Sequence, residues 1–133
     1  MTKDISKFNA EGYYDPTPYK ALKKKYMPLI YIASPFSGDV KTNVERAKRY
    51  CRFAISKGRI PLAPHLHYPQ FMDDGDMDER ELGLFFSLVL LGKCEELWVF
   101  DKVSEGMADE IAKAKRRKIP IRYFNTRCEE VTQ

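Results

Sequence analysis

Two patterns of hydrophobic and polar positions alternate along most of the chain. Short, continuously apolar runs such as Leu29 to Ala33 are typical of strands that are buried on both faces of a sheet. Longer segments carry apolar residues near the helical period, and the first of them stops before Gly58, which suits a helix C-terminus. We predict four strands, over residues 29–33, 60–63, 96–100 and 119–123. We predict three helices, over residues 39–57, 79–93 and 105–118.

Strands that alternate with helices favour an α/β fold with a parallel sheet. We expect a doubly wound, flavodoxin- or Rossmann-like sheet of four to five strands with helices on both faces. Pro61 places its strand at or near an edge, because proline cannot donate a ladder hydrogen bond. In such sheets ligands bind beyond the carboxyl ends of the strands. That rule selects three loops, over residues 33–39, 63–78 and 101–106.

The first 27 residues do not share these patterns. They are polar and aromatic, with a turn-rich run over residues 12–18 and a basic stretch over residues 20–25. We read residues 1–27 as an N-terminal arm and residues 28–133 as a single domain. The arm is too short to form a core, so its aromatic side chains are expected to pack on the main domain or on another subunit. These side chains are Phe8, Tyr13, Tyr14, Tyr19 and Tyr26.

Composition narrows the class of protein. An apolar fraction of 44% with 13% aromatic residues supplies a packed core and excludes a disordered chain. The longest strongly apolar stretch, Leu82 to Leu91, is about half of the ~20 residues that a membrane span needs. The N-terminus has no apolar h-region, and the three widely spaced cysteines indicate reduced thiols in the cytoplasm rather than a disulfide framework. A net charge of +4 does not by itself argue for nucleic-acid binding.

Candidate chemistry lies in the loops that follow the strands. The loop at residues 34–39 joins a buried strand to a helix N-terminus, where backbone N–H groups and the helix dipole favour an anion; Ser37 or Asp39 as a plain helix cap is the alternative. Asp101 ends the third predicted strand, and Glu110 lies about one turn inside the helix that follows. If Glu110 points back across the sheet edge, the two form a pair of carboxylates of the kind that glycosyl chemistry needs. The alternative for Glu110 is a solvated residue that pairs with Lys113.

Three other clusters are explained more simply. His65 and His67 lack a third ligand with suitable spacing, so we expect no metal and no other cofactor. The acidic run at residues 73–79 has its glycine misplaced for an EF-hand and fits a solvated loop. The basic run at residues 113–118 suits a helix C-terminus, without the aromatic interleaving or motif of a nucleic-acid-binding protein.

Three segments in this order resemble the nucleoside 2-deoxyribosyltransferase superfamily, and most of all its small, poorly characterised bacterial and phage branch. They are Tyr31-x-Ala-x-Pro-Phe, Gly58-x-x-Pro61, and the run from Cys94 to Ile111 with its Gly106-x-x-x-Glu110 spacing. The resemblance covers about residues 28–124. It implies that Glu110 attacks C1′ of a 2′-deoxyribosyl group and that Tyr31 orients the Glu110 carboxylate.

The resemblance also implies further site residues. Asp101 joins Tyr31 and Glu110 in the catalytic group and binds sugar hydroxyls, while Tyr68, like Phe36 and His65, is placed to contact the base. The expected substrate-binding residues are Ser34, Pro35, Phe36, Ser37, Gly38, His65, Arg80, Ser104, Gly106 and Met107. The family's acid, which protonates the leaving base, falls near Ser87 here, and an earlier carboxylate, Asp78, Glu79 or Glu81, is the open alternative. Met107 stands where a threonine is common.

The resemblance thus leads to an N-glycosidase or 2-deoxyribosyltransferase that acts on a nucleoside or its 5′-monophosphate, and Arg80 favours the phosphate. The alternative is a binding protein that captures a nucleotide or a nucleotide-derived signal without turnover. Family members assemble so that a neighbour helps to close the site, so we also expect a homodimer or a multiple of one.

Overall fold

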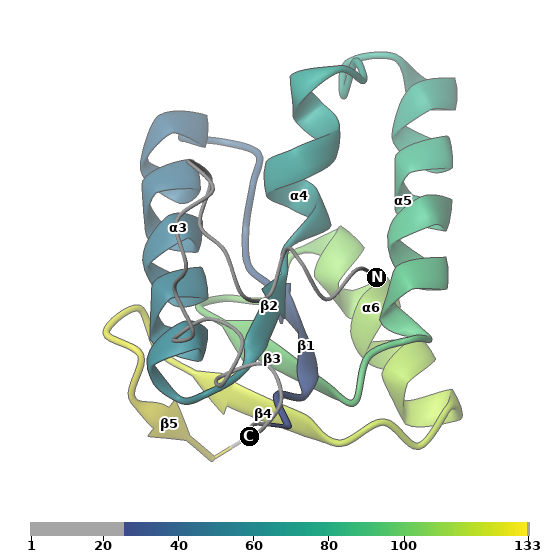
Figure 1. Ribbon diagram of the computed structural model, residues 1–133. Coiled ribbons are helices and arrows are strands. Elements are labelled where there is room, and N and C mark those ends of the chain that lie inside the picture. The colour runs from purple at the N-terminus through teal and green to yellow at the C-terminus, as the bar shows by residue number, and fades with distance from the viewer. Residues whose placement is uncertain (1–25, 133) are drawn as a thin grey trace, which may run out of the picture.

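A five-stranded sheet lies at the centre of the computed structural model, which describes residues 26–132 (Figure 1). The strand order is β2-β1-β3-β4-β5. The first four strands are parallel, and β5 pairs antiparallel with β4. The strands are β1 (Leu29–Ala33), β2 (Ile60–Leu62), β3 (Glu96–Phe100), β4 (Ile121–Phe124) and β5 (Glu130–Val131).

The helices cover both faces of this sheet, with α3 on one side and α5 and α6 on the other (Figure 1). The doubly wound α/β prediction is therefore confirmed. The helices are α3 (Val40–Ser56), α4 (Pro64–His67), α5 (Met77–Leu91) and α6 (Glu105–Arg116), with a 3₁₀ turn, η1, at Tyr68–Gln70. The predicted N-terminal arm lies outside the described residues, except for its last two.

Side-chain caps determine where the long helices begin. Asp39 accepts a hydrogen bond from the backbone N–H of Thr42 at the start of α3. Asp76 caps α5, which begins two residues earlier than the sequence predicted. Ser104 caps α6 by accepting from the N–H of Met107. These caps satisfy N–H groups that a helix leaves unpaired at its first turn.

The prediction of one continuous loop over residues 63–78 is wrong. Pro64 occupies the first turn of the short helix α4, where its fixed φ and missing N–H are favourable. The 3₁₀ turn η1 follows directly. As a result, His65 and Tyr68 are held on ordered backbone beside the carboxyl end of β1 rather than on an irregular loop.

Alternation along β1 and β3 sends successive side chains to the two faces of the sheet. Ile30, Ile32, Trp98 and Phe100 pack beneath α3. Tyr31, Ala33, Leu97 and Val99 face the other way, toward α5 and α6. All eight are at most 1% exposed, as expected of central parallel strands. The edge position predicted for the strand of Pro61 agrees with β2, which pairs only with β1 among the described strands.

The connections change direction between β1 and β3. From β1 the chain passes through α3 to β2 on one side, and then returns through α5 to β3 on the other side of β1. The crevice beyond the carboxyl ends of β1 and β3 is therefore the switch point at which doubly wound sheets bind ligands. None of the helices that the structure describes combines the length and apolar composition that a membrane crossing requires.

Candidate functional site

A cavity of about 470 Å³ lies beyond the carboxyl ends of β1 and β3. Its walls come from the β1–α3 loop, α4, η1, α5 and the first turns of α6. A volume of this size is typical of small-molecule sites. Because the cavity coincides with the switch point of the sheet, it is the natural place in which to look for chemistry.

Glu110 faces this cavity from α6 and is only 9% exposed. Its Oε2 accepts a hydrogen bond from the hydroxyl of Tyr31, which β1 contributes from beneath the cavity. The two residues are 79 positions apart in sequence, and parallel pairing of β1 with β3, followed directly by α6, brings them together. The alternative reading of Glu110 as a solvated residue is therefore wrong.

The surroundings of this pair control its protonation. Burial raises the pKa of Glu110 to about 7, and the negative charge of Asp109 acts in the same direction, while the hydrogen bond from Tyr31 opposes both. Burial and the adjacent Glu110 carboxylate raise the pKa of Tyr31 well above its usual value. Tyr31 thus stays a hydrogen-bond donor at neutral pH, while Glu110 changes charge near neutrality, which suits an acid, base or nucleophile.

A second polar pair, which is partly buried, also lines the cavity. The Oγ of Ser34, at the end of β1, is 2.8 Å from Nε2 of His65 in α4, and both residues line the cavity. Burial lowers the pKa of His65 to about 4. His65 is therefore a neutral imidazole at physiological pH, able to exchange a hydrogen bond with Ser34 or a ligand without carrying charge.

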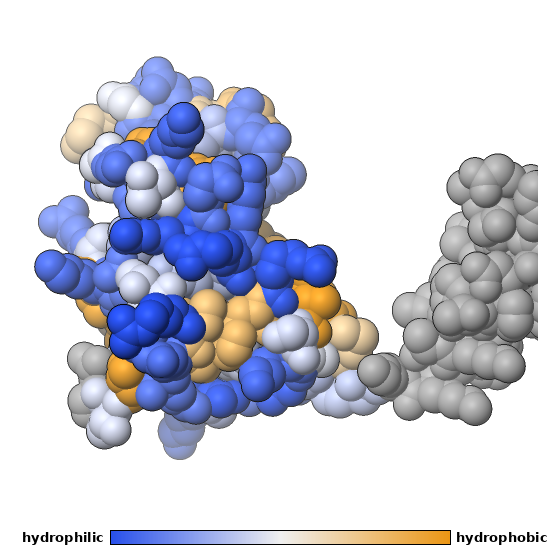
Figure 2. Space-filling model, turned by 90° about the vertical axis from the view of Figure 1, so that its left-hand side faces the viewer, coloured by the Kyte–Doolittle hydropathy of each residue, from blue (hydrophilic) through white to orange (hydrophobic). Residues whose placement is uncertain are grey.

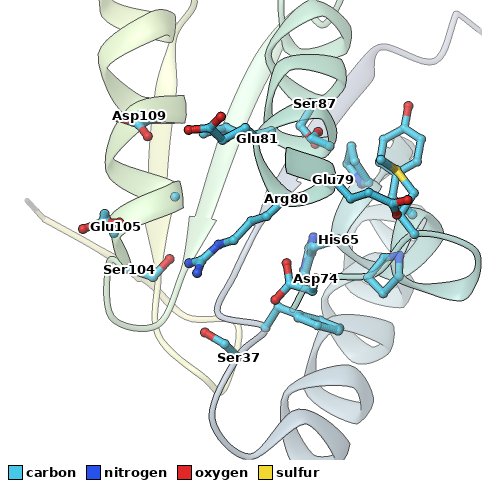
Figure 3. A pocket seen from close by; sticks show the side chains of 18 of the residues that line it. Ser37, His65, Asp74, Glu79, Arg80, Glu81, Ser87, Ser104, Glu105 and Asp109 are labelled. Carbon is cyan, nitrogen blue, oxygen red and sulfur yellow. The ribbon is translucent and has the colours of Figure 1, made fainter. Parts of the chain in front are cut away.

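One side of the cavity carries groups that suit an anion. Arg80 reaches from α5 across the cavity toward Ser104 and Ser37 (Figure 3). Ser104 caps α6, so the positive end of the α6 dipole points to the same place. Among the residues that line the cavity, Arg80 is the one permanent cation. A phosphate or carboxylate in this corner would meet a guanidinium, two hydroxyls and a helix N-terminus together.

The rest of the wall is strongly acidic. In addition to Glu110, six carboxylates line the cavity: Asp73, Asp74, Glu79, Glu81, Glu105 and Asp109. The Glu81 and Asp109 side chains lie near one another between α5 and α6, on the far side of Ser104 from Ser37 (Figure 3). Glu105, the residue next to Ser104, is one of these carboxylates, so it shares the corner that suits an anion. The surroundings of Arg80 are nevertheless the part of the wall where an anionic group is least disfavoured.

Most of the site residues that the sequence suggested line the cavity. They are Ser34, Phe36, Ser37, His65, Arg80, Ser104, Gly106, Met107 and Glu110, together with Tyr68. Tyr31 lies beneath the cavity and reaches it through Glu110. Pro35 and Gly38 belong to the same loop as Ser37 but are not among the lining residues. Gly38 instead provides a positive φ of 93° immediately before the N-cap of α3, a conformation that glycine adopts without strain.

Asp101 lies elsewhere. It has a positive φ of 70° at the end of β3, and its Oδ2 is 3.7 Å from Nη1 of Arg46 in α3. It does not line the cavity, so its predicted contact with sugar hydroxyls stays a prediction that this geometry does not favour.

Sequence reasoning missed some cavity residues, such as Leu84, and named Ser87 only as the position of the family's acid. Leu84 and Ser87 follow Arg80 at helical spacing on α5, which puts all three on one face, and that signal was available once Arg80 was chosen. Ser87, where the family's acid was expected, lines the cavity but donates its hydroxyl to the carbonyl of Gly83 at 3.0 Å. The other carboxylates of α5 and α6 that face the cavity are Glu79, Glu81, Glu105 and Asp109. The sequence offered Glu79 and Glu81 as possible replacements for the missing acid and gave no sign of Glu105 or Asp109.

Neither imidazole belongs to a metal centre within the described part of the chain, where His, Cys, Asp and Glu side chains form no group of three or more able to hold an ion. His67 packs instead against the rings of Tyr68 and Phe71, with centroid distances of 5.3 and 5.0 Å. The three cysteines are free thiols. Burial raises the pKa of Cys94 to about 12 and that of Cys51 to about 11, so neither is a reactive thiolate.

Comparison with solved structures gives a match of moderate closeness. A 2-deoxyribosyltransferase from the psychrotolerant bacterium Bacillus psychrosaccharolyticus, described as a biocatalyst for the synthesis of antiviral and antitumoral nucleosides, superimposes with a TM-score of 0.56. The match covers 79% of this chain and 77% of that one, at 19% sequence identity. This likeness establishes that the two proteins share a fold and are distantly similar.

Comparisons of sequence are less specific about activity. A search of curated proteins found no match. The sequence profile of one family matches residues 28–124, which include all of β1 to β4 and every residue that lines the cavity. The chain therefore belongs to the family described as a domain of unknown function, DUF7768.

Proposed function

We propose that the protein is an N-glycosidase or 2-deoxyribosyltransferase that breaks the bond between base and sugar in a deoxynucleoside 5′-monophosphate or the parent nucleoside. The observation that carries this proposal is the placement of Glu110. Its carboxylate is largely shielded from bulk solvent, faces a cavity of ligand size and accepts a hydrogen bond from the Tyr31 hydroxyl. A nucleoside-processing fold supports it from a second direction.

The first step is nucleophilic. An ionised Glu110 oxygen attacks C1′ of the sugar and forms an ester bond. The bond between C1′ and the base nitrogen breaks, and its electron pair leaves with the base, which takes up a proton from solvent water. The Tyr31 hydroxyl holds the second carboxylate oxygen, which fixes the direction of attack and favours the ionised form.

The second step restores the enzyme. Water or a second base attacks C1′, the ester oxygen leaves with its electron pair as the Glu110 carboxylate, and the incoming group loses a proton. Two successive inversions give net retention at C1′. A pKa of about 7 for Glu110 means that the nucleophile is only partly ionised at neutrality, so the rate of base release is expected to rise with pH through this value.

The part of the cavity near Arg80, Ser37 and Ser104 fixes the orientation of the substrate in this proposal. A 5′-phosphate placed between Arg80, Ser37 and Ser104 leaves the sugar facing Glu110 and the base near the aromatic wall of Phe36 and Tyr68. The acidic remainder of the wall opposes the reverse orientation. The two half-buried thiols and one buried thiol are free, which supports a cytoplasmic location. Assembly as a dimer stays a prediction.

The direct test is a panel of deoxynucleosides and their 5′-monophosphates, with release of free base followed by chromatography. Glu110→Ala should abolish release and leave ligand affinity within about tenfold, roughly 1.4 kcal/mol. Glu45→Ala is the matched control, because it removes an exposed carboxylate of α3, outside the cavity, that pairs with Lys48. A wild-type protein that releases base, with Glu110→Ala equally fast, would remove Glu110 from the mechanism.

The same panel separates the enzyme from the binding protein. Tight binding of a nucleotide with no release of base by the wild type would favour capture without turnover. Absence of the usual acid at the position of Ser87 is the observation that keeps this second function in view.

Arg80→Met tests the choice of substrate. Loss of the guanidinium should weaken binding of the 5′-monophosphate about tenfold or more and leave binding of the nucleoside unchanged. Arg52→Met, which removes an exposed cation of α3, is the control. Equal losses for both ligands would show that Arg80 does not read the phosphate.

A further inference from the structure

The outer face of α5 is unusually apolar for an exposed helix. After Glu81 the helix carries no charged residue. Leu82, Phe85 and Val89 are 46%, 60% and 41% exposed, and their i, i+3, i+7 spacing makes one continuous stripe. Leu84 belongs to the opposite side of the helix, which lines the cavity. A helix that is apolar on both sides is typical of one that is covered on both sides.

The other side of the molecule is the reference. Hydrophilic residues predominate on the face that Figure 2 shows, which is the side of α3. The exposed positions of α3 include Lys41, Glu45, Lys48 and Arg52. The helix α3 therefore presents charge to solvent, whereas α5 presents a stripe of large apolar side chains, which marks an interaction surface.

The stripe meets an acidic segment at the N-terminal end of α5. Residues 73–81 hold six acidic residues and one arginine. Asp78 is exposed and lies one turn before Leu82 on the outer face of the helix. This end of the stripe is therefore negatively charged.

Basic side chains gather at the other end. Lys93 is exposed and lies one turn after Val89. Arg117, the C-cap of α6, reaches the same end, because its Nη2 is 3.0 Å from the place that a Cβ on Gly92 would take. The last turn of α6 adds further cations at Lys113, Lys115 and Arg116. The stripe thus runs from an acidic end to a basic end.

This order is its own complement about a point immediately after Phe85. If two copies of α5 pack antiparallel around a two-fold axis at that point, residues equally distant from it in sequence face each other. Leu82 then faces Val89 of the other copy, and Asp78 faces Lys93. Two ion pairs flank an apolar centre, as in a homodimer interface with a hydrophobic core and a polar rim.

One pair of like charges falls in the same register, beyond the ends of the helix, where Asp76 would approach Glu95. Both carboxylates already accept hydrogen bonds within their own chain. Asp76 accepts from two N–H groups at the start of α5, and Glu95 accepts from the hydroxyl of Tyr26. Because Arg117 adds a second cation at the basic end, the charges at each end still favour the antiparallel pair.

We propose that two copies of this chain associate through the outer faces of α5, antiparallel around a two-fold axis next to Phe85. Asp78 of each copy pairs with Lys93 of the partner subunit. The contact also brings cations beside the acidic side of the cavity, since Glu79 and Glu81 line it. The family resemblance predicts a dimer but no contact surface, and the pattern on α5 selects one. This interface does not depend on the glycosidase proposal.

Sedimentation velocity of the full chain tests the surface, and we expect a dimer at micromolar protein concentration. Phe85→Glu places two carboxylates next to the axis, so it should raise the dissociation constant of the dimer by about tenfold or more. Ile55→Glu is the matched control at a 44% exposed apolar position on α3, and it should leave the constant unchanged.

Asp78→Lys and Lys93→Asp test the register. Each variant alone puts like charges opposite each other at both ends, so each should weaken its own dimer by about tenfold or more. An equimolar mixture of the two restores opposite charges in a mixed dimer, so mixing should recover the wild-type dissociation constant. Within one chain the two positions lie about 22 Å apart along the helix, so no contact inside a chain produces this recovery.

Each other outcome overturns the proposal. A wild-type protein that stays monomeric at micromolar concentration would show that a second copy does not cover the stripe. A dimer that Phe85→Glu does not weaken would place the interface elsewhere. A dimer that Phe85→Glu weakens, with no recovery in the mixture, would exclude the antiparallel register. None of these results bears on release of base, which is measured separately.

Discussion

Two buried tyrosines show how differently the two faces of the central sheet are used. Tyr31 and Tyr50 are both 1% exposed. Tyr50 belongs to α3 and packs on one face of the sheet, stacked on Phe100 with ring centroids 4.3 Å apart. Its hydroxyl has no hydrogen-bond partner among the described residues. Tyr31 lies on the other face, and its hydroxyl is committed to Glu110. The α3 face is built for packing, and the α5–α6 face holds a polar pair whose charge depends on pH.

A single strand, β1, contributes side chains to both of these faces. Ile30 and Ile32 point to the α3 face, and Tyr31 between them points to the cavity side. Consequently, substitutions on the two faces should separate into those that alter stability and those that alter chemistry. The following changes test that division, from the largest expected effect to the smallest.

Phe100→Ala should have the largest effect on stability. Phe100 is fully buried and stacks on both Tyr50 and Phe124, so we expect the free energy of unfolding to fall by about 3–5 kcal/mol. Urea unfolding measures the loss, and Phe71→Ala, at a 63% exposed position, is the control with an expected loss below about 1 kcal/mol. Activity per folded molecule should not change; a large change would contradict the division between faces.

Stability should depend on the charge of Glu110. Its pKa is about 7 in the folded protein and near 4.5 when unfolded. Because the pKa is higher in the folded protein, the protonated Glu110 stabilises the fold fully below pH 4.5, and this stabilisation is lost as the pH rises through 7. The free energy of unfolding should fall by about 3 kcal/mol over this range. Glu110→Gln lacks this term.

Urea unfolding of the wild type and of Glu110→Gln at pH 4.5, 6 and 8 measures the contribution of Glu110. The other titrating groups cancel in the difference between the two free energies of unfolding. The variant should gain on the wild type with rising pH. A difference that stays constant, or that shrinks, would show that the Glu110 carboxylate is not desolvated.

The fold and the site were predictable to different degrees, and the reasons are physical. The central strands β1 and β3 have the predicted bounds because burial on both faces makes them continuously apolar. Strand β5 was missed, since its two residues are exposed and it is too short to show an alternating pattern. The four-residue helix α4 is too short to show a period.

For the site, the local sequence pattern identified the loops that line the cavity but not the contacts between side chains. The contact between Tyr31 and Glu110 links residues on different elements, and only the family resemblance suggested it. Asp101 was expected in the cavity because it ends a strand there. Its left-handed backbone conformation and its ion pair with Arg46 depend on the tertiary fold and have no signature in the sequence.

Tyr31→Phe should change chemistry with little effect on packing. It removes the hydrogen bond that opposes the raised pKa of Glu110, so the carboxylate should ionise at higher pH. We expect release of base at pH 7 to fall about tenfold, with the rising limb of the pH profile displaced upward by about one unit. A slower enzyme with an unshifted profile would limit Tyr31 to orientation of the carboxylate.

Tyr50→Phe is the matched change on the other face, and the smallest. It removes a buried hydroxyl that has no partner within residues 26–132, so the free energy of unfolding should rise by about 1 kcal/mol. The pH profile of base release should be unchanged. Destabilisation of similar size would reveal a hydrogen bond to a water molecule or to the arm.

The central claim is that Glu110 forms a covalent bond to the sugar. The most direct measurement is rapid acid quenching during turnover of whichever deoxynucleotide releases base, followed by peptide mass mapping. We expect the peptide that contains Glu110 to gain the mass of one deoxyribosyl phosphate, with no such gain in Glu110→Ala. Release of base with no adduct, or with an adduct on another residue, would contradict the account.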